Sequence, residues 1–257
     1  MNRLLTLFQQ KKEKVLNIYF TAGFPRLNDT LALAEAIQEA GADLIEIGIP
    51  FSDPVADGET IQKANTRALQ NGMHVALLFE QLQKLRDSVK IPVILMGDVN
   101  PMLQYGTEDF CKKCQEVGVD GLILPNLPMD EYLAEFKPIF DRYGLLNIFL
   151  ITPQTSEERI RRIDENSAGF IYMVSSSSTT GSTKGISKDM EGYFSRVDQM
   201  SLNNPRLIGF GIKDKETFQQ ASAFANGAII GSAFIRAIEE SENPSLAAKD
   251  FVQAVLE

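Results

Sequence analysis

The sequence predicts an α/β fold, a single (β/α)8 barrel of the TIM type with one extra helix at its N-terminus. Short apolar runs alternate with stretches of helical period along the whole chain, and eight such runs can be counted. The length of 257 residues suits one barrel of about 250 residues. No change in composition marks a linker, so we expect one domain over residues 1–257. A doubly wound open sheet is the alternative.

The elements follow one another as a barrel requires. Residues 1–14 are amphipathic and should form a helix outside the barrel. The expected strands are Val15–Ala22, Leu44–Ile49, Ile91–Met96, Gly121–Leu124, Asn147–Ile151, Gly169–Ser175, Arg206–Gly209 and Ala228–Ile230. The expected helices are Asn28–Ala40, Thr60–Gln70, Val75–Ser88, Thr107–Glu116, Met129–Tyr143, Thr155–Asn166, Asp189–Met200 and Lys213–Ala225, followed by two further helical stretches. Recurring Gly-Ala or Gly-Val turns separate helices from the strands after them.

Composition argues against several classes of partner. The chain has 34 acidic and 25 basic residues, a formal net charge of -9, and no basic cluster, so nucleic acid is not an expected partner. No apolar stretch approaches the roughly 20 residues that span a bilayer, and the N-terminus has no cleavable apolar segment. We therefore expect no membrane association and a cytoplasmic location.

The residues that usually bind metals or act as general bases are scarce. Cys111 and Cys114 form a CxxC in a helical segment without a second pair, which predicts free thiols and no metal site. His74 is the only histidine and stands at the start of a helical stretch. Acid-base chemistry must therefore come from carboxylates, lysine or tyrosine.

The stretch Leu44–Gln62, LIEIGIPFSDPVADGETIQ, holds the clearest candidates for that chemistry. Glu46 lies in an apolar strand, and Asp57 ends the loop that follows the strand. A buried acid and a loop acid on one strand-loop-helix unit suit paired proton transfer. The alternative reading is an ion-paired core acid at Glu46 and a helix N-cap at Asp57, and this window alone leaves both open.

Two later loops carry the pattern of a phosphate site. The seventh strand ends in Gly209-Phe210-Gly211 and the eighth in Gly231-Ser232-Ala233, each leading into a helix, and Gly181 in the sixth loop could add a third edge. The alternative is that these glycines only form turns. Neither GxxxxGK[ST] nor GxGxxG occurs, so a small phosphorylated metabolite is a better candidate than a nucleotide.

Over its whole length the chain resembles the tryptophan synthase alpha subunit family, through IPFSDPVADG with its downstream IQ, the GFGI and GSA turns and the sixth-strand tyrosine. The resemblance implies cleavage of indole-3-glycerol phosphate to indole and glyceraldehyde 3-phosphate, without metal or cofactor in this subunit. It also implies an alpha2beta2 heterotetramer with a beta subunit that carries pyridoxal phosphate. A regulatory subunit with weakened catalysis, a free-standing lyase and an unrelated phosphosugar isomerase remain alternatives.

The resemblance also assigns roles to residues. Glu46 matches the acid-base residue, Asp57 the acid that engages the indole N–H, and Tyr172 the tyrosine beside that glutamate. The phosphate-binding positions are matched by Gly181, Phe210, Gly211, Gly231 and Ser232. Tyr19, Asp98 and Ile151 are expected to line the indole pocket.

Four residues depart from the family's usual motifs. Glu59 stands in place of Pro after ADG, Asp98 in place of Tyr, Asn126 in place of Asp, and Ser178 in place of Gly. Asp98 follows a strand, so we expect it near Glu46, where a further carboxylate would help Glu46 to keep its proton.

Overall fold

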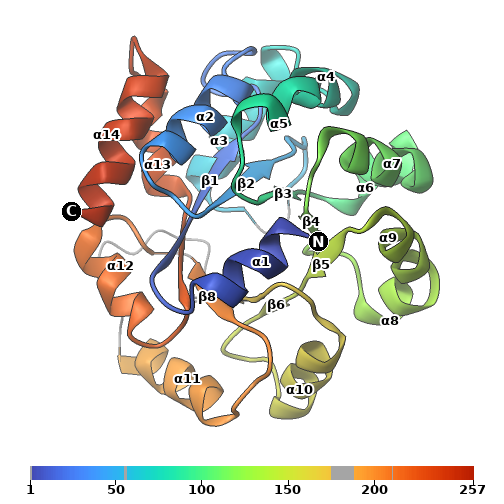
Figure 1. The fold of residues 1–257 in the computed structure, drawn as a ribbon, viewed down its shortest axis with the longest axis vertical. Helices are drawn as coiled ribbons and strands as arrows, with labels where there is room; N and C mark the ends of the chain where they lie inside the picture. The colour runs from blue at the N-terminus through green and yellow to red at the C-terminus, as the bar shows by residue number, and fades with distance from the viewer. Residues whose placement is uncertain (1, 55–56, 175–187, 210) are drawn as a thin grey trace.

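In the computed structural model, parallel strands form one sheet that nearly closes into a barrel inside a ring of helices (Figure 1). The structure describes residues 2–54, 57–174, 188–209 and 211–257. Its strands are β1 (Val15–Thr21), β2 (Leu44–Gly48), β3 (Val93–Met96), β4 (Gly121–Ile123), β5 (Leu146–Ile148), β6 (Leu150–Ile151), β7 (Ile171–Val174), β8 (Arg206–Gly209) and β9 (Gly227–Ile230). Their order is β5-β4-β3-β2-β1-β9-β8-β7-β6, so the expected TIM barrel is confirmed.

The expected fifth strand is divided in two at Phe149. β5 pairs with β4 and β6 pairs with β7, while the carbonyl of Phe149 between them accepts a hydrogen bond of 2.9 Å from the amide of Tyr172. The two pieces therefore occupy one strand position, and the barrel keeps the eight positions that the sequence predicts.

The helices lie outside the strands and cover their apolar runs. They are α1 (Arg3–Gln10), α2 (Thr30–Glu39), α3 (Glu59–Gln70), α4 (Val75–Gln81), α5 (Leu85–Ser88), α6 (Val99–Tyr105), α7 (Thr107–Val117), α8 (Met129–Glu131), α9 (Lys137–Tyr143), α10 (Glu157–Asn166), α11 (Lys188–Gln199), α12 (Lys215–Ser222), α13 (Ser232–Glu239) and α14 (Pro244–Leu256). A 3-10 turn, η1 (Leu82–Lys84), joins α4 to α5, and a π-helical segment, η2 (Tyr132–Phe136), joins α8 to α9. The stretches expected as single helices at these two places are thus each built from three segments.

Helix α6 was not expected from the sequence. Its N-cap is Asp98, whose side chain accepts a hydrogen bond of 2.8 Å from the amide of Asn100. Pro101 lies in the first turn, where a proline costs no hydrogen bond of the helix. The Asn-Pro pair therefore belongs to a helix start rather than to a loop.

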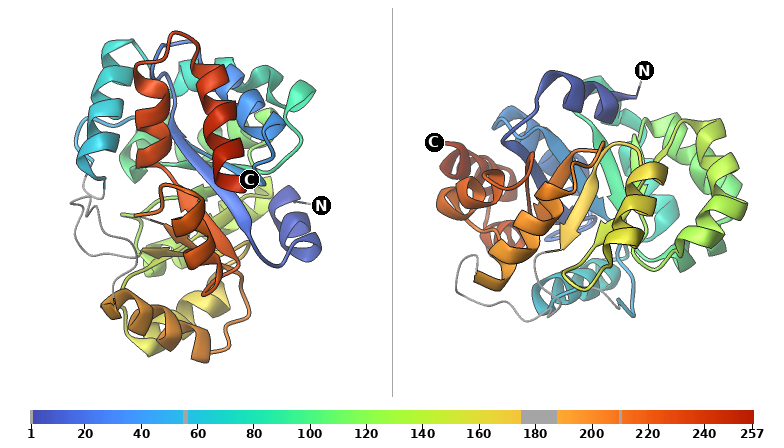
Figure 2. Two further views of the ribbon diagram at one scale, coloured as in Figure 1. Left: turned by 90° about the vertical axis from the view of Figure 1, so that its left-hand side faces the viewer. Right: turned by 90° about the horizontal axis from the view of Figure 1, so that it is seen from below.

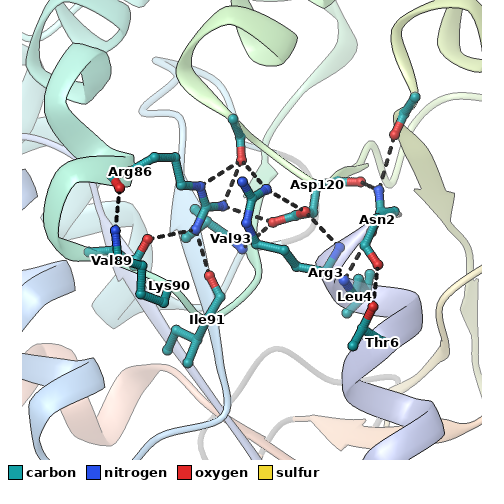
Figure 3. Close-up of polar contacts among 12 residues, drawn as sticks. Asn2, Arg3, Leu4, Thr6, Arg86, Val89, Lys90, Ile91, Val93 and Asp120 are labelled. Atoms are coloured by element: carbon teal, nitrogen blue, oxygen red, sulfur yellow. Dashed lines mark hydrogen bonds and ion pairs between the residues drawn. The ribbon is translucent and has the colours of Figure 1, made fainter.

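Helix α1 lies across one end of the barrel (Figures 1 and 2) and is held there by polar contacts (Figure 3). Asn2 Nδ2 donates to the carbonyls of Asp120 and Gly144, just before β4 and β5, at 2.7 and 3.0 Å. The buried carboxylate of Asp120 pairs with Arg3 at 3.1 Å and Arg86 at 2.8 Å. The expected extra helix therefore closes the end of the barrel where the strands begin.

The scarce residues lie where the sequence predicts. Cys111 and Cys114 are buried free thiols on α7, and burial raises the pKa of both. His74 is the N-cap of α4, with Nδ1 accepting from the amide of Leu77 at 3.2 Å. Among the described residues no helix is long and apolar enough to cross a bilayer, and no group of three His, Cys, Asp or Glu side chains could hold a metal ion.

Candidate active site

Glu46 lies in the middle of β2 and is buried, with 1% of its surface exposed. Its only described hydrogen bond comes from Asn17 Nδ2, which donates to Oε2 at 2.8 Å, and Oε1 has no partner within the described part of the chain. Burial raises the pKa of Glu46 to about 8, helped by the charge of Asp57 and opposed by the hydrogen bond from Asn17. No cation among the described residues pairs with this carboxyl, so the structure gives no support to the reading of Glu46 as an ion-paired core acid.

Asp57 stands two residues before the start of α3 and does not cap that helix. The N-cap is Gly58, and Asp57 Oδ2 accepts instead from Asn65 Nδ2 at 3.0 Å. Burial raises the pKa of Asp57, and the hydrogen bond from Asn65 opposes that rise. The loop acid is therefore held by a side chain of the helix that follows it, and the N-cap reading is wrong.

Two buried tyrosines accompany Glu46 inside the barrel. Tyr19 on β1 is next to Glu46 in the strand register, and Tyr172 on β7 is close enough to feel its charge. Burial is the main reason that the pKa of each phenol lies well above its usual value, so both stay neutral. A Cβ at Gly48 would overlap the hydroxyl of Tyr19, and one at Gly209 that of Tyr172, so these strand ends need glycine to admit the phenols.

A cavity opens beside these residues. Its lining comprises the polar residues Tyr19, Asp57, Asn65, Asp98 and Asn126 and the apolar residues Ile49, Phe51, Pro54, Met96, Gly97 and Pro125. Apart from Tyr19 on β1 and Met96 at the end of β3, the lining comes from the segments that follow β2, β3 and β4, at the carboxyl ends of these strands. The structure thus brings Tyr19, Asp57 and Asp98 to one cavity. Glu46 is paired with Tyr19 in the strand register, but it does not line the cavity.

Asp98 and Asn126 form a reciprocal contact between two loops. Asp98 Oδ2 accepts from Asn126 Nδ2 at 2.8 Å, and Asn126 Oδ1 accepts from the amide of Val99 at 3.0 Å. The expectation that Asp98 helps Glu46 to keep its proton is not met, because burial and Asp57 are the causes of the raised pKa. Two departures from the family motif are therefore bonded to each other.

The candidate phosphate positions follow two neighbouring strands, β8 and β9. Gly211 has φ +79°, a conformation that other residues rarely adopt. Gly231 is the N-cap of α13 and lies against the ring of Tyr19, and Ser232 is the first residue of that helix. Gly181 and Phe210, and the departure at Ser178, lie outside the described residues.

One predicted pocket residue, Ile151, and one departure from the family motif, Glu59, lie away from the cavity lining. Ile151 on β6 is fully buried and does not line the cavity; its carbonyl accepts from the hydroxyl of Tyr193 at 3.1 Å. Glu59 is the first residue of α3 and forms an exposed pair with Lys63 at 2.7 Å. A carboxylate suits a helix N-terminus as a proline does, so this departure preserves the start of α3.

Sequence reasoning missed two asparagines that hold the acids. Asn17 is a fully buried amide in the apolar run VLNIYFT of β1, and Asn65 is a buried amide on α3. A polar residue inside an apolar run was the available signal for Asn17. Asn65 lies eight residues beyond Asp57, at a spacing that only the folded loop explains.

Known proteins resemble this chain in both sequence and structure over nearly its whole length. The family model described as tryptophan synthase alpha chain matches residues 5–256. The tryptophan synthase alpha chain of Flavobacterium johnsoniae is 60% identical over 241 residues, 94% of this chain and 95% of the relative. The crystal structure of the alpha chain from Legionella pneumophila has a TM-score of 0.88 at 34% identity and covers 99% of this chain and 96% of its own. A crystal structure of the tryptophan synthase complex from Pyrococcus furiosus gives 0.86 at 33% identity, with coverages of 96% and 99%. The chain therefore belongs to the tryptophan synthase alpha chain family.

Proposed function

We propose that Glu46 is the acid and the base with which this chain performs its family's reaction in tryptophan biosynthesis, the cleavage of indole-3-glycerol phosphate into indole and glyceraldehyde 3-phosphate. The observation that carries the proposal is a buried carboxyl with one unpartnered oxygen and a pKa of about 8. Such a group holds a proton near neutral pH and can still release it.

The reaction can be written with one proton leaving and returning. Glu46 gives its proton to C3 of the indole ring, which makes that carbon tetrahedral and leaves a carboxylate. The carboxylate then takes the proton of the neighbouring glycerol hydroxyl. As the carbonyl forms, the bond to C3 breaks and its electron pair restores the aromatic ring. Glu46 ends protonated as it began.

Asp57 supplies the negative charge that the ring nitrogen needs during this sequence. It lines the cavity, and Asn65 fixes its carboxylate. An anion close to the indole N–H stabilises the positive charge that protonation at C3 creates. Tyr172 and Tyr19 are neutral phenols that orient the ring and exclude water. Asp98 lines the cavity, and Ile151, which does not line it, stays a prediction for the indole pocket.

Glu46→Gln tests the acid-base role. The amide keeps the shape of the side chain but cannot donate the proton, so the turnover number should fall by more than about 100-fold. Binding of glycerol phosphate, followed by thermal unfolding, should stay near that of the unchanged protein and serves as the control for folding. Turnover close to normal in this variant would refute the assignment.

The substrate phosphate is proposed to bind at Gly211, Gly231 and Ser232, together with Gly181 and Phe210. The glycines let the backbone approach a phosphate, and the N-terminus of α13 directs amide donors towards it. Glycerol phosphate should raise the melting temperature, and Gly211→Val should abolish that rise because its φ of +79° excludes valine. An unchanged melting temperature at high millimolar glycerol phosphate would argue that the site lies elsewhere.

A beta subunit is the proposed partner, in an alpha2beta2 assembly in which the beta subunit carries pyridoxal phosphate and this chain has no cofactor of its own. The proposed docking surface surrounds Pro54 and Asn100-Pro101, where Leu103 on α6 is 48% exposed. The beta subunit should stimulate cleavage by ordering the Asp57 loop. Leu103→Asp should weaken the stimulation, and Leu246→Asp, at a leucine 53% exposed on α14, is the matched control.

The same assay separates the alternatives. Equal activity alone and with the beta subunit would favour a free-standing lyase, and stimulation of the beta reaction without cleavage would favour a regulatory subunit. The cytoplasmic location stays a prediction.

A further inference from the structure

Asn17 is a buried amide whose one described side-chain hydrogen bond goes to the carboxyl of Glu46. It lies on β1, two residues before Tyr19, and its side chain is fully buried. Its Nδ2 donates to Glu46 Oε2 at 2.8 Å, and within the described part of the chain its Oδ1 has no partner. Glu46 Oε1 also has no hydrogen-bond partner within the described part of the chain.

A buried asparagine is costly unless its polar atoms are satisfied. The hydrogen bonds that such an amide does form must therefore offset the cost of burying it. Here only the nitrogen is bonded, and its partner is the carboxyl at the centre of the site. The partner of this bond, rather than the unpartnered oxygen, therefore points to a role of Asn17 in the state of Glu46.

We propose that Asn17 is a positioning residue for Glu46, which binds one carboxyl oxygen in both protonation states and leaves the other oxygen to exchange a proton with the substrate. The inference rests on the proposed acid-base role of Glu46. When the carboxyl is ionised, the amide nitrogen donates to it, as in the structure. When the carboxyl is protonated at Oε1, Oε2 is its carbonyl oxygen and still accepts from the amide nitrogen, so the proton stays on the oxygen that exchanges it.

The surroundings of Glu46 offer no equivalent partner among the described residues. The titratable groups that face it are Asp57, whose charge raises its pKa, and the phenols of Tyr19 and Tyr172, which are neutral. On the other side, β3 presents Ile94 in register with Glu46. Among these groups, the amide of Asn17 is the one with a described hydrogen bond to the carboxyl.

Asn17→Leu removes the amide at similar volume. The carboxylate then loses a hydrogen bond that stabilises the charged form, so the pKa of Glu46 should rise and the limb of the pH-rate profile that reports it should move to higher pH. The turnover number should fall by about tenfold or more, with little change in KM. The titration is followed directly by the carboxyl carbon resonance of labelled glutamate, assigned by its loss in Glu46→Gln. Asn17→Ala, which avoids overpacking, gives a second variant.

Asn147→Leu is the matched control. Asn147 is also a buried strand asparagine, on β5, with an unpartnered Oδ1 and no described contact with Glu46. The inference is overturned if the pKa of Glu46 and the turnover number are the same in both Asn17 variants as in Asn147→Leu. If Glu46→Gln itself keeps normal turnover, the proposed role of Glu46 fails instead, so the two failures are distinguishable.

Discussion

Replacing Glu46 by glutamine should make the protein more stable relative to the unchanged chain as the pH rises towards neutrality. In the folded chain the pKa of Glu46 is about 8, against an ordinary value of 4.5 that applies after unfolding. Below pH 4.5 both states hold the proton, so the full stability is present. Between pH 4.5 and 8 the folded chain keeps a proton that the unfolded chain has lost, so stability falls as the pH rises.

The size of the effect follows from the shift. One proton held only by the folded state changes the free energy of unfolding by about 1.4 kcal/mol per pH unit. At pH 7 the unchanged protein has therefore lost about 3 kcal/mol that Glu46→Gln retains. This is a large part of the roughly 5 to 15 kcal/mol that stabilises a protein domain. The buried acid therefore reduces stability near neutral pH, a cost that the proposed acid-base role would explain.

Urea unfolding of both proteins at pH 5, 6 and 7 measures the effect. The quantity to follow is the difference in free energy of unfolding between Glu46→Gln and the unchanged protein. The amide itself adds an offset to this difference, but that offset does not change with pH. The difference should grow in favour of Glu46→Gln by about 2 to 3 kcal/mol from pH 5 to pH 7. A difference that stays constant over this range would refute the reasoning, since Glu46 would then have the same pKa folded and unfolded.

Three further outcomes are expected. Asp120→Ala should lower the free energy of unfolding by about 3 kcal/mol or more, because it leaves two arginines without their buried partner. Glu59→Ala, which removes an exposed pair, is the control and should leave the free energy of unfolding nearly unchanged. Asn65→Leu should lower the turnover number more than it weakens glycerol phosphate binding, since it frees the loop carboxylate; equal losses would contradict this. A double-mutant cycle of Asp98→Ala and Asn126→Ala should give a coupling free energy of about 1 kcal/mol in urea unfolding, and additivity would exclude the pair.

The barrel and its acids could be predicted because their signals are local. Alternation of apolar runs with helical stretches and the glycines between them indicated the strand positions, and an acid inside an apolar run marked Glu46 as special. The helix α6 was missed because Asn-Pro reads as a turn until the cap at Asp98 is seen. The cap depends on a side-chain conformation, which a local pattern does not specify.

The partners of the acids could not be predicted because they depend on strand register. Asn17 is opposite Leu44 and Tyr19 is opposite Glu46, so the contact between Asn17 and Glu46 runs diagonally across two neighbouring strands. A shift of one residue would turn the amide away from the barrel interior. The relative stagger of the strands is set by closure of the whole barrel, and it is not visible in either strand alone.

The departures at positions 98 and 126 bear on whether this chain is a weakened enzyme. Taken singly, each replaces a residue of the family's motif and suggests a loss. In the fold, the Asp98 carboxylate accepts from the Asn126 amide, which in turn accepts from the backbone amide of Val99. An aspartate at 126 would place two carboxylates at that contact, where they would repel each other and lack a donor. An aspartate at 98 therefore requires a donor such as the amide at 126. The two departures together keep the hydrogen bonds between these residues of the cavity lining, so they do not indicate that the site has been lost.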